Sequence, residues 1–179
     1  MTLAVLRLLH RIIRDKRMTT HLALSARAFG SSSFFYSGDH DSGVEESIND
    51  IVLEWGGEFN VEYLEKPSNF IKEWKSKGGI IIHLTMYGIE LFNLIEIMRN
   101  MLDKDLLVVV GGAKVPGFVY QLADYNIAIG HQPHSEIAAL SVFLDNLSKG
   151  EARKIKHPDA KINIVPTERG KQAEANRKE

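Results

Sequence analysis

The stretch VVVGGAKVPGFVYQLADYNIAIGHQPHSEIAALSVFLDNL, residues 108–147, carries most of the information about the fold. Its β-branched start, Val108–Val110, is typical of a strand buried on both faces. Gly111–Gly112 follow, and glycine lets the backbone turn and approach a ligand with no side chain in the way. A short helix through Leu122 and a second apolar strand over residues 126–129 come next. The order strand, glycine loop, helix, strand predicts part of a layered α/β sheet.

A second loop follows that second strand. Gly130 ends the strand, the polar segment HQPHSE (131–136) comes next, and a helix then runs to Leu147. Both loops lie after the carboxyl ends of strands, where open parallel sheets bind small ligands. These two loops are therefore the candidate ligand site. The apolar residues of the helix cover much of its circumference and are Ile137, Leu140, Val142, Leu144 and Leu147.

The rest of the chain continues this alternation of apolar strands and amphipathic helices. Six strands alternating with helices predict an α/β fold with a mostly parallel, doubly wound sheet. Residues 1–150 are expected to form this domain, and residues 151–179 a basic, partly ordered C-terminal extension without structure at its end. The further expected strands are 3–8, 33–36, 59–63 and 79–83, and the further expected helices are 21–29, 44–55, 67–76 and one ending near Met101.

Composition narrows the class of protein. The 179 residues include no cysteine, which excludes thiolate catalysis, cysteine–zinc sites and disulfides and favours an intracellular setting. No apolar run reaches the length of a membrane span, and the N-terminus has no signal-peptide pattern. We expect a soluble, cytoplasmic protein with no membrane partner.

The net charge of −1 hides an uneven distribution. Residues 1–30 carry a charge of +5 and residues 149–179 one of +4, so the middle carries −10. Basic ends on an acidic body indicate a localised site for a polyanion. For the C-terminal end, lysines that are simply solvated are an equally good interpretation.

Several common sites are absent from the sequence. The dinucleotide fingerprint, the P-loop and the nucleophile elbow have no match. His131 and His134 are three residues apart, but without cysteines or an acidic cluster we expect no metal there. Hydrogen bonding within a polar loop is the ordinary role for such histidines.

The combined motifs resemble those of the SPOUT class of RNA methyltransferases. The similarity is closer to one family in that class, the archaeal tRNA cytidine-56 ribose 2′-O-methyltransferases. It rests on residues 5–30, HLTMYG (83–88), VGGAKVP (110–116), LADYNIAIGHQPHSEIAAL (122–140) and PTERGK (166–171).

This resemblance implies a C-terminal trefoil knot, S-adenosylmethionine as cofactor, tRNA as substrate and a homodimer with its active site near the interface. The helix 135–147 would be a main dimer element, although burial in the protein's own core is the alternative. The implied cofactor-binding residues are Leu84, Gly111, Gly112, Ala113, Lys114, Val115, Ile127, Ala128, Ile129, Gly130, His131, Gln132, Pro133 and His134.

The reaction implied by the resemblance is attack of a ribose 2′-hydroxyl on the cofactor's methyl group. Because that hydroxyl is a weak acid, a group must deprotonate it or stabilise the developing oxyanion. Many relatives use an arginine at the position that Leu24 occupies here. The candidates are instead Arg17, Arg14 and Arg11, expected in a loop before Thr19, with His21 as a possible base. Phosphate binding alone is the alternative role for each arginine.

Two rival functions stay open at the level of sequence. A base-methylating enzyme of the same class would share the fold and cofactor but need a pocket for a base. A non-catalytic RNA-binding module of the same fold would lack cofactor affinity.

Overall fold

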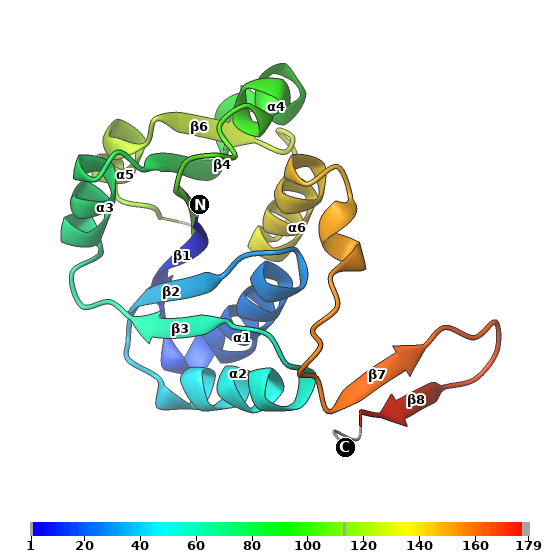
Figure 1. Ribbon diagram of the computed structural model, residues 1–179. Helices are drawn as coiled ribbons and strands as arrows, with labels where there is room; N and C mark the ends of the chain where they lie inside the picture. Colours follow the sequence, from blue (N-terminus) through cyan, green and yellow to red (C-terminus); the bar gives the residue numbers. More distant parts are fainter. Residues whose placement is uncertain (1, 113, 177–179) are drawn as a thin grey trace.

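A computed structural model describes residues 2–112 and 114–176 (Figure 1). Six strands form one sheet in the order β3-β2-β1-β5-β4-β6, and every neighbouring pair is parallel. This confirms the predicted α/β fold with a parallel sheet. The trefoil knot stays a prediction. The strands are β1 (Leu3–His10), β2 (Ser33–Gly38), β3 (Asn60–Tyr63), β4 (Ile80–Glu90), β5 (Leu106–Gly111) and β6 (Tyr125–Ala128).

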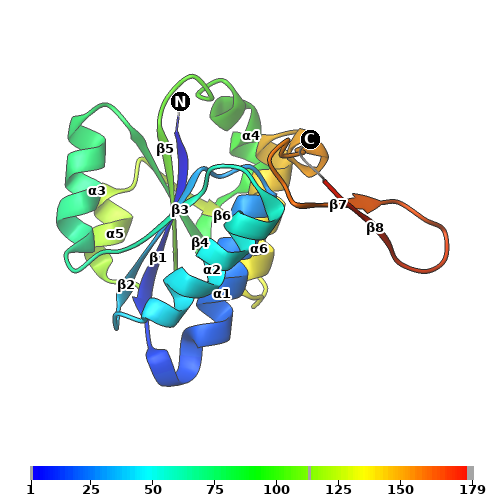
Figure 2. The same ribbon diagram turned by 60° about the horizontal axis from the view of Figure 1, so that its bottom comes forward.

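Helices cover both faces of the sheet (Figures 1 and 2). One face carries α1 (Ile12–Ala28), α2 (Ser42–Trp55), α4 (Leu91–Arg99) and α6 (Glu136–Leu147). The other face carries α3 (Pro67–Ser76) and the short α5 (Gly117–Leu122). The sheet therefore lies between two helical layers, as expected for a doubly wound arrangement.

Strand β5 shows why the valine run predicted a doubly buried strand. Val108 and Val110 pack into the core on the side of α1 and α6, while Val109 packs on the side of α3 and α5. All three valines are buried. Successive side chains of a strand point to opposite faces, so a strand covered on both sides needs apolar residues throughout.

The arginine-rich segment differs from the prediction. Residues 12–20 are not a loop, because α1 begins at Ile12 and runs through them. The amide N–H groups of Arg14 and Asp15 donate to the carbonyl of Arg11 and close the first turn. Asp15 and Thr19 are buried polar side chains with partners in β1. Contacts of Asp15 and Thr19 with β1 thus hold the first turns of α1 against the sheet. Because these contacts are polar, the spacing of apolar residues does not predict a helix there.

The C-terminal extension, which the sequence predicts to be partly ordered, contains a short helical turn and two strands. The 3₁₀ turn η1 (Glu151–Lys154) leads to β7 (Ile162–Val165), which pairs antiparallel with β8 (Gln172–Ala175). This hairpin projects from the body of the protein (Figures 1 and 2). The side chains of β7 and β8 are largely exposed, so the two strands are held together mainly by backbone hydrogen bonds. Composition does not report such backbone pairing. No helix among residues 2–112 and 114–176 is long and apolar enough to span a bilayer.

Candidate active site

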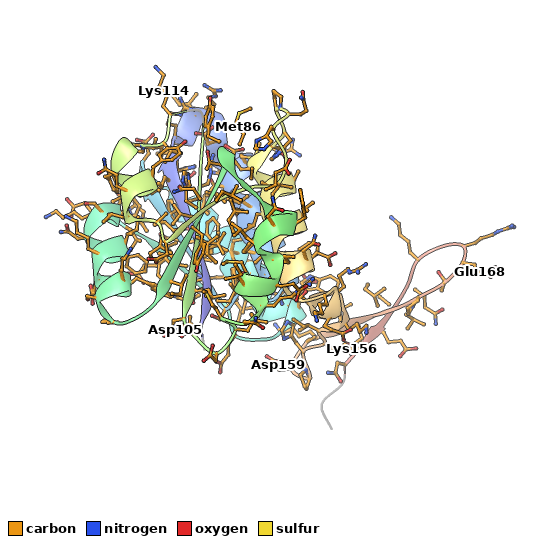
Figure 3. All side chains as sticks on the ribbon, turned by 90° about the horizontal axis from the view of Figure 1, so that it is seen from above. Met86, Asp105, Lys114, Lys156, Asp159 and Glu168 are labelled. Atoms are coloured by element: carbon orange, nitrogen blue, oxygen red, sulfur yellow. The ribbon has the colours of Figure 1, made fainter. Side chains whose placement is uncertain are left out.

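A cavity of about 420 Å³ opens at the carboxyl ends of β4, β5 and β6. Figure 3 shows Met86 and Lys114 together at this end of the molecule. Both loops singled out in the sequence contribute to it, as predicted from their places after parallel strands. Its walls are mainly apolar, with a few polar groups, as is common for small-molecule sites. The lining residues are His83, Leu84, Thr85, Met86, Tyr87, Val110, Gly111, Gly112, Val115, Tyr120, Ile127, Ile129, Gln132, Pro133, His134, Ser135, Glu136 and Ala139.

Two glycines, Gly111 and Gly88, allow close packing around this cavity, the first against a side chain and the second against a backbone segment. A Cβ on Gly111 would lie 2.5 Å from Cγ2 of Val115, which is itself in the cavity wall. A Cβ on Gly88 would lie 2.5 Å from the carbonyl of Asn126, where the register between β4 and β6 is irregular. A larger residue at position 111 would displace Val115 in the cavity wall, and one at position 88 would force β4 and β6 apart next to the cavity.

His83, which borders the cavity, has a hydrogen-bond acceptor that no described residue uses. The amide nitrogen of Asn126 donates to the carbonyl of Tyr120 at 3.0 Å, so its oxygen faces Nδ1 of His83 at 2.8 Å. Because that oxygen only accepts, Nδ1 carries the proton and Nε2 keeps a lone pair. Nε2 is buried and has no partner among the described residues. Burial lowers the pKa of His83, which keeps the ring neutral.

Glu136 is the only carboxylate among the described residues that line the cavity. It lies in the first turn of α6, next to Ser135, whose hydroxyl accepts from the N–H of Ala138 and caps the helix. Its Oε1 lies 3.6 Å from the position of a Cβ on Gly112. A carboxylate at a helix N-terminus is favoured by the helix dipole. Glu136 therefore gives the cavity a built-in negative charge.

A buried polar cluster lies behind Glu136, between β1 and α1. The Arg7 guanidinium donates to the hydroxyl of Thr19 and lies 3.8 Å from the carboxylate of Asp15. Nδ1 of His10 is 2.7 Å from the same hydroxyl, and its Nε2 is 3.7 Å from Asp41. All five side chains are buried. A charged cluster enclosed in this way fixes the start of α1 against the sheet.

The charges of this cluster shift its ionisation. Burial lowers the pKa of Arg7, against the opposing effects of Asp15 and Glu136. Burial acts to raise the pKa of Asp15, but the hydrogen bond from Arg11 and the charges of Arg7, Arg11 and Arg14 hold it below its usual value. Burial and the charge of Arg7 lower the pKa of His10. Around Thr19, the cluster at neutral pH thus joins a cationic Arg7 and an ionised Asp15 to a neutral imidazole of His10.

The predicted catalytic residues lie on the exposed side of α1 and do not line the cavity of their own chain. Arg11 binds Asp15 at 3.1 Å, and Arg14 approaches the same carboxylate at 4.0 Å. Arg17 has no ion-pair partner within residues 2–112 and 114–176, and His21 is exposed one turn later. Since α1 starts at the carboxyl end of β1, beside β5, Arg11 and Arg14 lie at the same edge of the sheet as the cavity, with Arg17 and His21 one and two turns further along the helix.

Most of the predicted cofactor residues come together at the cavity. Lys114 is exposed, and Ala128, Gly130 and His131 do not line it. Nδ1 of His131 instead approaches the carbonyl of Met86 at 2.7 Å, which ties the loop after β6 to the last part of β4. Ala113 lies outside the described residues. The residues that do line the cavity are Leu84, Gly111, Gly112, Val115, Ile127, Ile129, Gln132, Pro133 and His134.

Sequence reasoning missed the inner groups of the site. Arg7 and His10 sit in the apolar run of β1, and a charged residue inside a strand is the signal that would have found them. The sequence offers no pattern that identifies Glu136 or His83 as site residues, apart from their positions next to the ends of strands. No group of three histidine, aspartate or glutamate side chains that could hold a metal occurs in the part of the chain that the structure describes.

Comparison with solved structures identifies the fold. The SpoU methyltransferase AviRb from Streptomyces viridochromogenes, solved with the cofactor AdoMet, matches with a TM-score of 0.62 and 14% identity over 84% of this chain. The chain spans 58% of the length of that protein. The TrmH/SpoU tRNA modifying enzyme of A. aeolicus matches with a TM-score of 0.60 and 16% identity, over 85% of this chain and 76% of the other. The fold is that of the SpoU and TrmH methyltransferases.

The chain belongs to the family described as tRNA ribose 2′-O-methyltransferase, aTrm56, which matches residues 55–174. A tRNA (cytidine(56)-2′-O)-methyltransferase from Methanopyrus kandleri is 51% identical over 170 residues, covering 95% of this chain and 94% of the relative. The enzyme of the same description from Thermococcus kodakarensis is 52% identical over 171 residues, covering 94% of each chain. The resemblance found in the sequence motifs is thereby confirmed.

Proposed function

We propose that the protein uses S-adenosylmethionine to methylate the ribose 2′-hydroxyl of cytidine 56 in tRNA, as a homodimer. The observation that carries the proposal is the cavity at the carboxyl ends of β4, β5 and β6, whose Glu136 acts electrostatically on Arg7 in the buried cluster at the start of α1. Family membership and the names of the close relatives support the substrate.

The cavity residues fit S-adenosylmethionine. Gly112 leaves room for a planar or sugar group against the backbone, because, among the described residues, the only heavy atom near the position of a Cβ there is Oε1 of Glu136 at 3.6 Å. Nε2 of His83 offers a buried acceptor for an amino or hydroxyl group, and Glu136 offers a negative charge. The first turn of α6 presents backbone N–H groups that favour a carboxylate. When bound, this cofactor supplies an activated methyl group, so no metal is required.

Arg17 is our first candidate to act on the 2′-hydroxyl. Arg11 and Arg14 are both drawn to Asp15, whereas the guanidinium of Arg17 remains available for the substrate. A guanidinium stays protonated at neutral pH, so it would stabilise the developing oxyanion of the ribose. Arg14 and Arg11 would hold the backbone phosphates on either side. His21 is left as the candidate base.

Exposed apolar side chains support a dimer. Tyr87, Ile89 and Phe92, at the end of β4 and the start of α4, are 80%, 57% and 72% exposed, and Val142 of α6 is 42% exposed. Three large exposed apolar side chains within six residues, Tyr87, Ile89 and Phe92, support a protein interface at the end of β4. Because Arg17 does not line the cavity of its own chain, we propose that it acts at the cavity of the partner. Most apolar residues of α6 pack into the core of their own chain, which leaves few of them for a dimer interface.

Methyl transfer from labelled S-adenosylmethionine to a tRNA transcript, followed by nucleoside mass analysis, tests this function. We expect 2′-O-methylcytidine in the T-loop fragment, and its absence after a cytidine 56→uridine change. A methylated base would overturn the ribose assignment. Absence of both incorporation and cofactor binding would support an RNA-binding module instead.

Mixing two inactive variants tests the shared active site. Arg17→Ala keeps the cavity, and Gly111→Val keeps the arginine. If Arg17 serves the partner's cavity, each mixed dimer has one intact site and activity returns on mixing. If both groups act within one chain, the mixture stays inactive and the proposal of a shared site fails.

A further inference from the structure

A second cavity, of about 550 Å³, lies at the root of the C-terminal hairpin. Figure 3 shows Lys156, one of its residues, at the end of the molecule opposite Met86 and Lys114. It is therefore separate from the candidate active site. Its lining residues come from the C-terminal end of α1, the end of α2, η1, the segment that links η1 to β7, and β7 itself. They are Arg27, Ala28, Trp55, Ala152, Arg153, Ile155, Lys156, His157, Ala160, Ile162, Asn163 and Ile164.

The lining of this second cavity is basic. Arg27, Arg153, Lys156 and His157 contribute to it, and none of the described lining residues is acidic. Two of the cations also have neighbours within the protein. Arg27 donates to the carbonyl of Gly56 at 2.6 Å, and Nε of Arg153 binds Asp145 at 2.8 Å. Lys156 is exposed and has no ion-pair partner in the described ranges.

Apolar and aromatic groups complete the walls. Trp55 is half-buried, and the aliphatic side chains of Ile155 and Ile164 are 49% and 61% exposed. A basic groove with an indole and exposed aliphatic groups matches the chemistry of an RNA segment, since phosphates bind cations and bases stack on aromatic rings.

The root of the hairpin is held rigidly, so this cavity is preformed. The N–H of Gly57 donates to the carboxylate of Asp159 at 2.9 Å, and the ring of His157 packs where a Cβ of Gly57 would lie. The N–H of Lys161 donates to the carbonyl of Glu54, and the Asn176 side chain donates to the carbonyl of Pro158. These bonds tie the root of the hairpin to the loop that follows α2.

We infer that this basic cavity binds the ribose–phosphate backbone of tRNA at a distance from the methylated nucleotide. The inference rests on the proposed function only in naming tRNA as the RNA. Charge complementarity argues for it, because a polyanion would neutralise Lys156 and fill a cavity whose described lining is basic and not acidic. A bound tRNA would then touch each subunit at two places, the active-site edge and the root of the hairpin.

A charge-reversal pair tests the inference directly. Lys156→Glu reverses an exposed cation of the cavity, and Lys154→Glu makes the same change two residues away on a side chain that pairs with Glu151 outside the cavity. We expect the first variant to weaken tRNA binding several-fold and to lower the slope of log affinity against log salt by about one or more, as when a phosphate-binding cation is removed. The Lys154 variant should bind tRNA nearly as the parent does. Affinity for S-adenosylmethionine should be the same in both.

A fluorescence measurement gives independent evidence. Trp55 and Trp74 are the two tryptophans, so Trp74→Phe leaves Trp55 as the reporter. We expect tRNA to change Trp55 emission in this variant, and Lys156→Glu to weaken that response.

The outcomes separate this inference from the proposed function, because binding is measured without methyl transfer. Equal losses for the Lys154 and Lys156 variants, or no loss for either, would overturn the cavity assignment. A change in the sedimentation mass of Lys156→Glu would also overturn it, since the cavity would then seat a second copy of the chain.

Discussion

The carboxylate of Asp15 lies 3.8 Å from the buried guanidinium of Arg7, across the junction of β1 and α1. The pair links β1, the first strand in the chain, to α1, the helix that carries the proposed catalytic residue Arg17. Because both side chains are buried, each leaves an uncompensated charge if the other is removed.

Arg7→Met should therefore destabilise the fold. We expect the free energy of unfolding to fall by roughly 3–5 kcal/mol, as when one partner of a buried pair is removed. Arg14→Met is the matched control, since it removes a 71% exposed arginine near the same carboxylate and should cost at most about 1 kcal/mol. Urea unfolding measures both. Equal losses of unfolding free energy in the two variants would show that the buried Arg7 stabilises the fold no more than the exposed Arg14 does.

Gly111→Val should abolish binding of S-adenosylmethionine and leave the fold largely intact. The added side chain would meet Val115 and push it into the cavity. Gly117→Val is the control, because a Cβ there meets open space. Calorimetric titration and circular dichroism check both parts. Tight binding by a folded Gly111 variant would contradict the assignment of this loop.

Replacing Arg14 and Arg17 together by alanine should weaken tRNA binding and reduce its salt dependence. Removing one phosphate-binding side chain lowers the slope of log affinity against log salt by about one. Arg17→Ala alone should reduce turnover at saturating tRNA more than Arg14→Ala alone, since Arg14 is drawn to Asp15. Single-turnover assays at two salt concentrations measure these effects. An unchanged salt slope would place the RNA-binding surface elsewhere.

Glu136→Gln should weaken the binding of S-adenosylmethionine more than that of S-adenosylhomocysteine. The two ligands share adenine, ribose and amino-acid groups and differ in the sulfonium charge, which the carboxylate of Glu136 in the cavity wall would stabilise. Glu46→Gln on the exposed face of α2 changes the protein charge equally and should leave both affinities alone. An equal loss for both ligands would assign Glu136 to a group that they share.

The stability of the fold should fall as the pH drops below about 6.5. Burial lowers the pKa of both His10 and His83 from 6.5, so below this pH the unfolded chain takes up protons that the folded chain does not. The free energy of unfolding then decreases with falling pH. His83→Gln should flatten this dependence in thermal unfolding between pH 5 and 8. A variant as pH-sensitive as the parent would exclude His83 as a source.

The sequence by itself determined the layered α/β fold, the place of the ligand loops and the family. Apolar strands such as Val108–Val110 and glycine loops such as Gly111–Gly112 are formed by residues that are neighbours in the chain. Their conformational preferences can therefore be predicted from the sequence. Specific motifs then narrowed the family further. The same local signals failed at the arginine-rich start of α1 and at β8, because neither segment has an apolar face.

Only the tertiary structure decided which polar groups are buried together. Arg7 is far from Glu136 in the chain, and packing of α1 and α6 on the sheet brings their charges close enough to interact. His10 and Asp41 likewise come within 3.7 Å of each other only in the folded protein. The basic cavity likewise joins the end of α2 to the C-terminal hairpin through the close approach at Gly57. Such sites depend on distances between segments that are remote in sequence. Burial strengthens the interactions between charges at these distances, because the dielectric constant is lower inside the protein than in water.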